Sequence, residues 1–183
     1  MAQQSHKVGD ANNPSWLVEN PDSVDNEVLS FFLDYWRSGR KGMPLPLRES
    51  FVPREVRGHL QWVVMADAVP QTTEFRYRLV GSRASEYFLG DGTGKTIRDA
   101  FAGVEESFVA GVEWIYRRVC EARFPIRMWG PSSRWGSVYF PSYDALYLPY
   151  SSDGEQADRV LNIFWYSRTQ MQARVMPSLR AAV

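Results

Sequence analysis

The stretch FRYRLVGSRASEYFLGDGTGKTIRDAF, residues 75–101, contains the pattern from which the fold can be predicted. Its first residues alternate: Phe75, Tyr77 and Leu79 lie on one side, and Arg76 and Arg78 lie on the other. This alternation predicts a strand with one face against a core. The remainder is rich in glycine and small polar residues, which predicts short irregular helices over residues 82–101. The stretch therefore marks a strand that leads into a helical connection.

The segments on either side supply the other elements. Residues 62–67 alternate as a strand that is apolar on both faces, and residues 104–122 have the apolar spacing of a long helix. Three further strands are expected at 126–129, 137–150 and 160–168, the last two joined by a hairpin turn at Asp153 and Gly154. Because tightly connected strands pair antiparallel, we expect an α+β fold: a five-stranded antiparallel sheet with helices on one face. The expected buried stripe of the long helix is Val104, Phe108, Val112, Ile115 and Val119.

The chain divides into four expected parts. Residues 1–20 are polar and read as a flexible tail, and residues 171–183 read as a C-terminal tail. Residues 21–60 form an N-terminal helical extension, with one helix capped by Asp22 or Ser23 and a shorter helix between Ser50 and Leu60 that has Pro53 in its first turn. Residues 61–170 form the core.

Composition narrows the function classes. The 183 residues suit one domain, and 21 basic residues balance 21 acidic ones, so the basic excess typical of a nucleic-acid binder is absent. The single Cys120 excludes a disulfide within the chain and a zinc site of several cysteines. The first residues lack a secretory signal, and no apolar run approaches membrane-spanning length. We expect a cytoplasmic protein without nucleic-acid or membrane partners.

Several short motifs occur in a fixed order along the chain. They are Trp36, Pro44 to Arg48, Pro53, Tyr77 to Gly81, Asp91 to Lys95, and YLPYSSDGE at 147–155. These motifs and the order of the expected elements resemble those of PAS domains, in particular compact single-domain bacterial members with an N-terminal helical extension. The resemblance covers about residues 24–168. It implies a module that senses a small ligand or docks a partner in signalling, with no reaction of its own.

No cofactor can be named from the sequence. GDGTGKT at 90–96 is not a phosphate-binding loop, because Leu89 occupies the position of the first glycine in that motif. Cys120 lacks the Asn-Cys-Arg-Phe context of light-sensing PAS domains, and residues 104–122 contain no histidine that could ligate haem. His6 and His59 are too few and too far apart for a familiar metal site.

The leading hypothesis is a non-enzymatic sensory or regulatory domain. The alternative is a small α+β cone-type enzyme, such as a cyclase or isomerase, with an apolar pocket. Such an enzyme needs an acid and base pair or a buried carboxylate in that pocket, whereas the assigned inward positions are aromatic and aliphatic.

A small, mostly hydrophobic metabolite would bind between the long helix and the inner face of the sheet. The sequence leaves open whether this aromatic interior is a cavity or a filled core. The predicted ligand-binding residues are Tyr77, Leu79, Tyr87, Phe88, Phe101, Phe108, Val112, Tyr139, Tyr147 and Phe164.

A homodimer is also predicted. The predicted helix from Val24 to Trp36 is apolar on two faces, and the final strand has no polar face, so the outer face of the sheet needs a cover. Pairing of two N-terminal helices would bury the second apolar stripe. The rival account is that the helix folds back over its own sheet and leaves a monomer. The predicted interface residues are Leu29, Phe32, Leu33 and Trp36.

Overall fold

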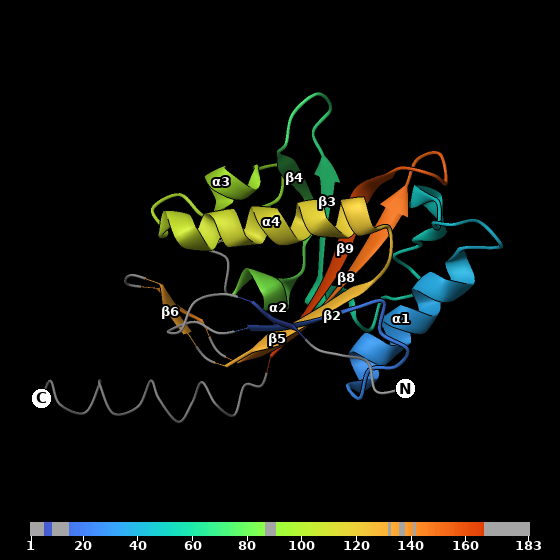
Figure 1. The fold of residues 1–183 in the computed structure, drawn as a ribbon, viewed down its shortest axis with the longest axis horizontal. Helices are drawn as coiled ribbons and strands as arrows, with labels where there is room; N and C mark the ends of the chain where they lie inside the picture. The colour runs from blue at the N-terminus through green and yellow to red at the C-terminus, as the bar shows by residue number, and fades with distance from the viewer. Residues whose placement is uncertain are drawn as a thin grey trace, which may run out of the picture.

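The computed structural model describes residues 6–8, 15–86, 91–131, 133–135, 138–140 and 142–166. It contains a seven-stranded antiparallel sheet in the order β1-β2-β5-β8-β9-β3-β4 (Figure 1). The strands are β1 (His6–Val8), β2 (Ser15–Glu19), β3 (Val63–Ala68), β4 (Phe75–Val80), β5 (Ile126–Gly130), β8 (Tyr143–Ser151) and β9 (Ala157–Tyr166). A separate hairpin pairs β6 (Ser133–Trp135) with β7 (Val138–Phe140). The predicted α+β class is confirmed.

Two strands lie where a flexible tail was expected, and this explains the larger sheet. β2 pairs with β5, and β1 pairs with β2, so the N-terminal segment adds two strands beyond the expected five. Leu17 of β2 is buried against the inner face, and the Asn20 amide donates to the carbonyl of Pro125 at 2.7 Å. The prediction for residues 6–8 and 15–19 was wrong. These strands are short and are surrounded by polar residues, so no clear strand pattern is visible in the sequence, and they form by pairing along the edge of the sheet.

Three helices cover the inner face of the sheet. They are α2 (Ser82–Ser85), α3 (Ile97–Ala100) and the long α4 (Glu106–Ala122), which Figure 1 shows in front of the central strands. The expected short helices and long helix are thus confirmed.

The buried stripe of α4 is rotated from the expected one. Val109 and Tyr116 are buried, whereas Phe108 and Val112 are only half-buried at the edge of the same cluster. Tyr116 packs its ring against those of Phe75, Tyr77 and Tyr147 on the sheet, so its side of the helix faces inward.

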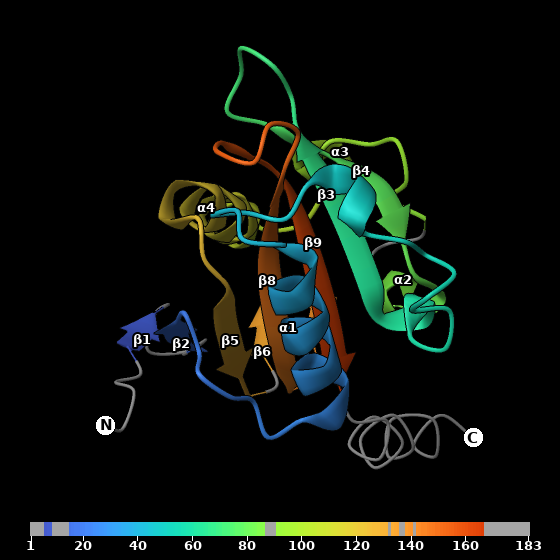
Figure 2. The ribbon, with the colours of Figure 1, turned by 90° about the vertical axis from the view of Figure 1, so that its right-hand side faces the viewer.

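The remaining α-helix, α1 (Glu27–Gly39), is the first in the chain and lies on the opposite, outer face of the sheet. It crosses β8 and β9, as Figure 2 shows, so helices cover both faces of the sheet and not one. Asn26 is its N-cap: its side-chain oxygen accepts from the amides of Val28 at 3.0 Å and Leu29 at 3.2 Å. The expected caps Asp22 and Ser23 lie before this position, in the turn that leads to the helix.

The second helix of the extension does not form. Residues 53–59 make turns closed by bonds between residues three apart, from Glu55 to Val52 and from His59 to Val56. Gly58 is a poor helix former, which disfavours a continuous helix through these residues. Single 3-10 turns occur at Arg48–Ser50 and Leu60–Trp62.

Candidate functional site

Four polar side chains meet beneath α4, inside the apolar cluster of the inner face. Tyr77 comes from β4, Tyr116 from α4, Tyr147 from β8 and Asn162 from β9. All four are between 0 and 5% exposed. The Tyr116 ring meets the rings of Tyr77 and Tyr147 edge to face, with centroids 6.3 and 5.8 Å apart. We call these four residues the inner polar cluster.

The strand register places the members of this cluster. Asn162 is directly opposite Tyr147 on one side and Val64 of β3 on the other, so it occupies the middle of the sheet. Tyr77 is held through its backbone: its amide donates to the Lys95 carbonyl at 3.0 Å, and its carbonyl accepts from the Gly94 amide at 2.9 Å. The glycine-rich turn after β4 therefore fixes one wall of the cluster.

Two atoms of the inner polar cluster lack a hydrogen bond. Neither the Tyr116 hydroxyl nor Oδ1 of Asn162 has a partner among the described residues. Burial raises the pKa of Tyr116, although the nearby side chains of Asn162 and Tyr77 lower it in part. Burial also raises the pKa values of Tyr77 and Tyr147, and neighbouring tyrosines add to the shift. The three hydroxyls therefore stay protonated and can each donate a hydrogen bond.

The predicted ligand-binding residues fall into three groups. Tyr77, Phe101 and Tyr147 are buried in the inner cluster, and Phe108, Val112 and Phe164 pack against it half-buried. The structure thus brings six of them to one interior. Tyr87 and Phe88 lie outside the described residues, and of Tyr139 only its backbone in β7 is described.

Leu79, also predicted to bind the ligand, lies on the outer face of the sheet and not with the other predicted residues on the inner face. The pairing of β3 with β4 shifts between Met65 and Ala66, so that Ala66 is opposite Tyr77 while Met65 is opposite Leu79. Arg78 is the extra residue of this bulge. A bulge reverses the alternation beyond it, and Leu79 consequently packs in the outer cluster with α1.

Tyr116 and Asn162 were missed at the sequence level. Asn162 is the lone polar residue in the apolar run VLNIFWY at 160–166, and a buried amide in such a run is a recognisable signal. Tyr116 gave a weaker signal, because it falls outside the stripe that starts at Val104.

The predicted dimer residues lie inside the chain. Leu29, Phe32, Leu33 and Trp36 are at most 3% exposed and pack on the outer face of their own sheet. The Trp36 indole donates to the Pro149 carbonyl at 2.6 Å, which joins α1 to β8. These four residues cannot form a surface for a partner, and the placement matches the rival account in which the helix folds back.

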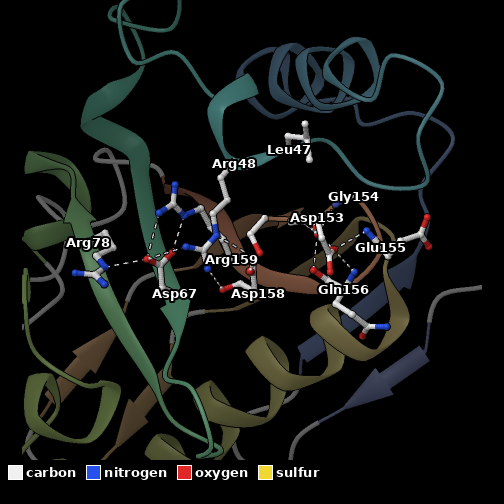
Figure 3. A network of polar contacts seen from close by, with 12 residues as sticks. Leu47, Arg48, Asp67, Arg78, Asp153, Gly154, Glu155, Gln156, Asp158 and Arg159 are labelled. Atoms are coloured by element: carbon white, nitrogen blue, oxygen red, sulfur yellow. Dashed lines mark hydrogen bonds and ion pairs between the residues drawn. The ribbon is translucent and has the colours of Figure 1, made fainter.

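An ionic network on the outer face joins the N-terminal extension to the sheet (Figure 3). Asp67 of β3 accepts from Arg159 of β9 at 2.6 Å and from Arg78 of β4 at 2.8 Å. The guanidinium of Arg48, in the extension, lies 3.8 Å from the Asp67 carboxylate. Its Nε donates to Oδ1 of Asp158 at 2.9 Å. Arg78 follows the inward-facing Tyr77, so its side chain lies on the outer face, where it reaches Asp67.

The hairpin turn between β8 and β9 lies next to this network (Figure 3). The Asp153 carboxylate accepts from the amides of Glu155 and Gln156, both at 2.8 Å. Backbone hydrogen bonds from Gln156 and Glu155 lower the pKa of Asp153 to about 2. Gly154 has a φ of 86°, which favours glycine, so the predicted turn at Asp153 and Gly154 is confirmed.

A buried carboxylate, Glu113, and a thiol, Cys120, are two side chains that could act as catalytic groups, but their surroundings do not favour such a role. Glu113 is a buried carboxylate on α4, but it pairs with Arg98 at 3.0 Å and Arg117 at 3.8 Å. Burial raises the pKa of Cys120 to about 12, with further contributions from Asp158 and Glu121, so its thiol stays protonated and poorly nucleophilic.

In the described part of the chain, no helix combines the length and the apolar character needed to cross a membrane.

Comparison with known proteins gives one match. Residues 24–165 match the PAS domain family, from the segment before α1 to the penultimate residue of β9. Neither the curated proteins nor the solved structures yield a match. The match includes the five strands β4-β3-β9-β8-β5, except for Tyr166 at the end of β9, together with the short helices after β4 and the long α4. The chain belongs to the PAS domain family and is, in general terms, a sensory or regulatory domain.

Proposed function

We propose that this PAS domain senses a small molecule held in the inner polar cluster, beneath α4. The observation that supports the proposal is that two buried atoms, the Tyr116 hydroxyl and Oδ1 of Asn162, have no hydrogen-bond partner among the residues that the structure describes. Leaving such an atom buried and unpaired costs about 1–3 kcal/mol, so two of them in one apolar cluster are better explained by a third group that satisfies both.

The surroundings define the class of ligand. The apolar walls come from Phe75 and Ala66 of the sheet and from Val109 and Val119 of α4. Tyr116 can donate a hydrogen bond, and Oδ1 of Asn162 can accept one. The ligand is therefore a neutral, mostly apolar molecule that carries an acceptor next to a donor, as an amide or a hydroxyketone does.

We propose further that another signalling protein recognises the ligand-bound form of this domain. α4 and the turn at Gly94 and Lys95 both support the cluster, so a ligand that satisfies Tyr116 and Asn162 stabilises their packing. Binding that orders these elements shifts the population toward one surface that a partner can recognise.

Native mass spectrometry of the purified protein, combined with two variants, tests the proposal. We expect wild type to carry a non-covalent ligand. Tyr116→Phe and Asn162→Leu each remove one of the two polar groups. Each should raise the dissociation constant of the ligand about tenfold, the effect of losing a hydrogen bond of about 1.5 kcal/mol, so that less ligand stays bound through purification.

Tyr150→Phe is the matched control. The Tyr150 hydroxyl is also buried without a partner, but it lies in the outer cluster beside Phe51. This variant should keep the ligand. A wild-type protein free of ligand, with Tyr116→Phe more stable than wild type, would contradict the proposal, because the hydroxyl would then be an uncompensated cost.

A further inference from the structure

A short segment between β4 and α4 covers part of the inner polar cluster. It consists of residues 97–102, which contain α3 and the two residues after it, and we call it the α3 flap; Figure 1 shows α3 beside α4. Three of its side chains are buried in the apolar cluster of the inner face: Ile97, Ala100 and Phe101. A Cβ added at Gly92 would lie 3.4 Å from the Tyr77 ring and 3.5 Å from the Ala100 side chain, so the flap lies next to Tyr77.

The other two helices over the cluster are tied to the sheet. Arg118 of α4 donates to the Glu19 carboxylate of β2 at 2.7 Å. The Tyr166 hydroxyl of β9 donates to the Arg83 carbonyl of α2 at 2.7 Å. On the side of the sheet, the paired strands β4, β3, β9 and β8 close the cluster. A molecule that enters the cluster therefore has to displace a helical element, and neither of these ties holds the α3 flap.

The two ends of the flap are held differently. Before it, the Lys95 carbonyl accepts from the Tyr77 amide at 3.0 Å and Thr96 forms a bridge with Arg76, so this end stays on β4. After it, Gly103 is exposed with a φ of 86°, and a Cβ added there would meet nothing within 4 Å. Because glycine accepts a wide range of backbone angles, the chain can pivot at Gly103 while the other end stays on β4.

One arginine fastens the flap to α4. Nη1 of Arg98 donates to both carboxylate oxygens of Glu106 at 2.8 and 3.1 Å, and its Nη2 donates to Glu113 at 3.0 Å. The guanidinium thus spans two turns of α4. Glu113 is only 6% exposed, so its bond to Arg98 is stronger than the exposed bond to Glu106. We call these three residues the Arg98 clasp.

We propose that the α3 flap is the entrance to the inner polar cluster and that the Arg98 clasp holds it shut. This inference rests on the proposed function, because it describes how the ligand reaches its site. Arg117 lies 3.8 Å from Glu113, so the buried carboxylate keeps a cation when Arg98 leaves it, and the flap can open and close reversibly. The clasp sets how fast the ligand exchanges, whereas Tyr116 and Asn162 set how tightly it binds.

Hydrogen exchange of the full chain, followed by mass spectrometry, tests the clasp without any ligand. A helix of four residues is unstable once it leaves the sheet, so opening exposes the amides of Ala100 and Phe101, which bond to the carbonyls of Thr96 and Ile97. Arg98→Met keeps the length of the side chain and removes its charge. It should raise the exchange rate of peptides covering residues 97–101 about tenfold, the effect of losing a hydrogen bond to a charged group.

Two further measurements separate opening of the flap from unfolding. Exchange in β8 and β9 should stay as in wild type, and a similar rise there would overturn the proposal, because the whole domain would then be opening. Glu106→Gln removes only the exposed partner of the clasp and should raise exchange in the same peptides by a smaller factor than Arg98→Met.

Arg117→Met is the matched control. It removes the other cation beside Glu113 but no contact between the flap and α4. Exchange in the flap should stay within about twofold of wild type. Equal rises in Arg98→Met and Arg117→Met would overturn the clasp, because the effect would then come from the loss of a cation near Glu113.

The entrance is tested by release of the small molecule that co-purifies with wild type, followed by native mass spectrometry after dilution into ligand-free buffer. Arg98→Met should release it about tenfold faster than wild type and Arg117→Met at the wild-type rate. Faster exchange in the flap with an unchanged release rate would overturn the entrance and leave the proposed function standing. A wild-type protein that carries no molecule would refute the proposed function and the entrance with it, whereas hydrogen exchange would still decide the clasp.

Discussion

Asp67 shows how a single buried carboxylate is kept charged in this protein. Its side chain is 8% exposed, and burial alone would raise its pKa. Hydrogen bonds from Arg159 and Arg78, with the charge of Arg48 nearby, outweigh that effect and lower the pKa. The folded state thus binds a proton at Asp67 less readily than the unfolded chain does, and the carboxylate stabilises the fold wherever it is ionised.

The direction of this shift predicts a dependence on acid. The contribution of Asp67 is fully present above the ordinary aspartate pKa of about 3.9 and is lost as the pH falls through the lower folded value. Asp67→Asn should reduce the free energy of unfolding by about 1–3 kcal/mol near pH 7 and by clearly less near pH 2. Urea unfolding at both pH values measures this. Asp34→Asn is the control, because the Asp34 side chain is 73% exposed and should show little change.

Individual side chains also mark where sequence reasoning reached its limit. Tyr77 and Tyr147 could be assigned to the inner face because strict alternation predicts it, and both are buried there. Leu79 could not, since the bulge at Arg78 depends on pairing with β3, which has no local signature. The buried Asn162 was visible as a polar residue in an apolar run, but its neighbour Tyr116 becomes evident only when α4 is docked.

At the scale of elements, α1 shows how the chain provides its own cover for the outer face. The sequence correctly required a cover for a sheet that is apolar on both sides. It could not decide between a second copy and the same chain, because both bury the same side chains. The choice follows from contacts of α1 and of the segment after it. Trp36 of α1 donates to the carbonyl of Pro149 in β8, and Arg48 donates to the carboxylate of Asp158 in β9, so the extension is tied to its own sheet.

The start of α1 gives a prediction at this scale. Asn26 accepts two amide hydrogen bonds, so Asn26→Ala should lower the free energy of unfolding by about 1 kcal/mol. Ser23→Ala should leave it within about 0.5 kcal/mol of wild type, because Ser23 is exposed and precedes the helix. Urea unfolding of both variants measures the difference. A loss at Ser23 with none at Asn26 would mean that the helix begins earlier.

For the whole molecule, the sequence predicted the fold class, the five strands of the PAS arrangement and the long helix. These follow from periodicity, which survives folding because each element buries one apolar stripe. The two N-terminal strands were not predicted, since they are short and gain stability only from pairing with β5. Ligand binding stays a proposal that rests on how separate elements meet beneath α4.

A high-resolution crystal structure of the protein, purified without added ligand, tests the central claim most directly. The decisive feature is the electron density between the Tyr116 hydroxyl and the Asn162 amide. The proposed sensory function predicts a non-protein group within hydrogen-bond distance of both. Density that shows Tyr116 and Asn162 bonded directly to each other, with the surrounding space filled by side chains, would contradict it.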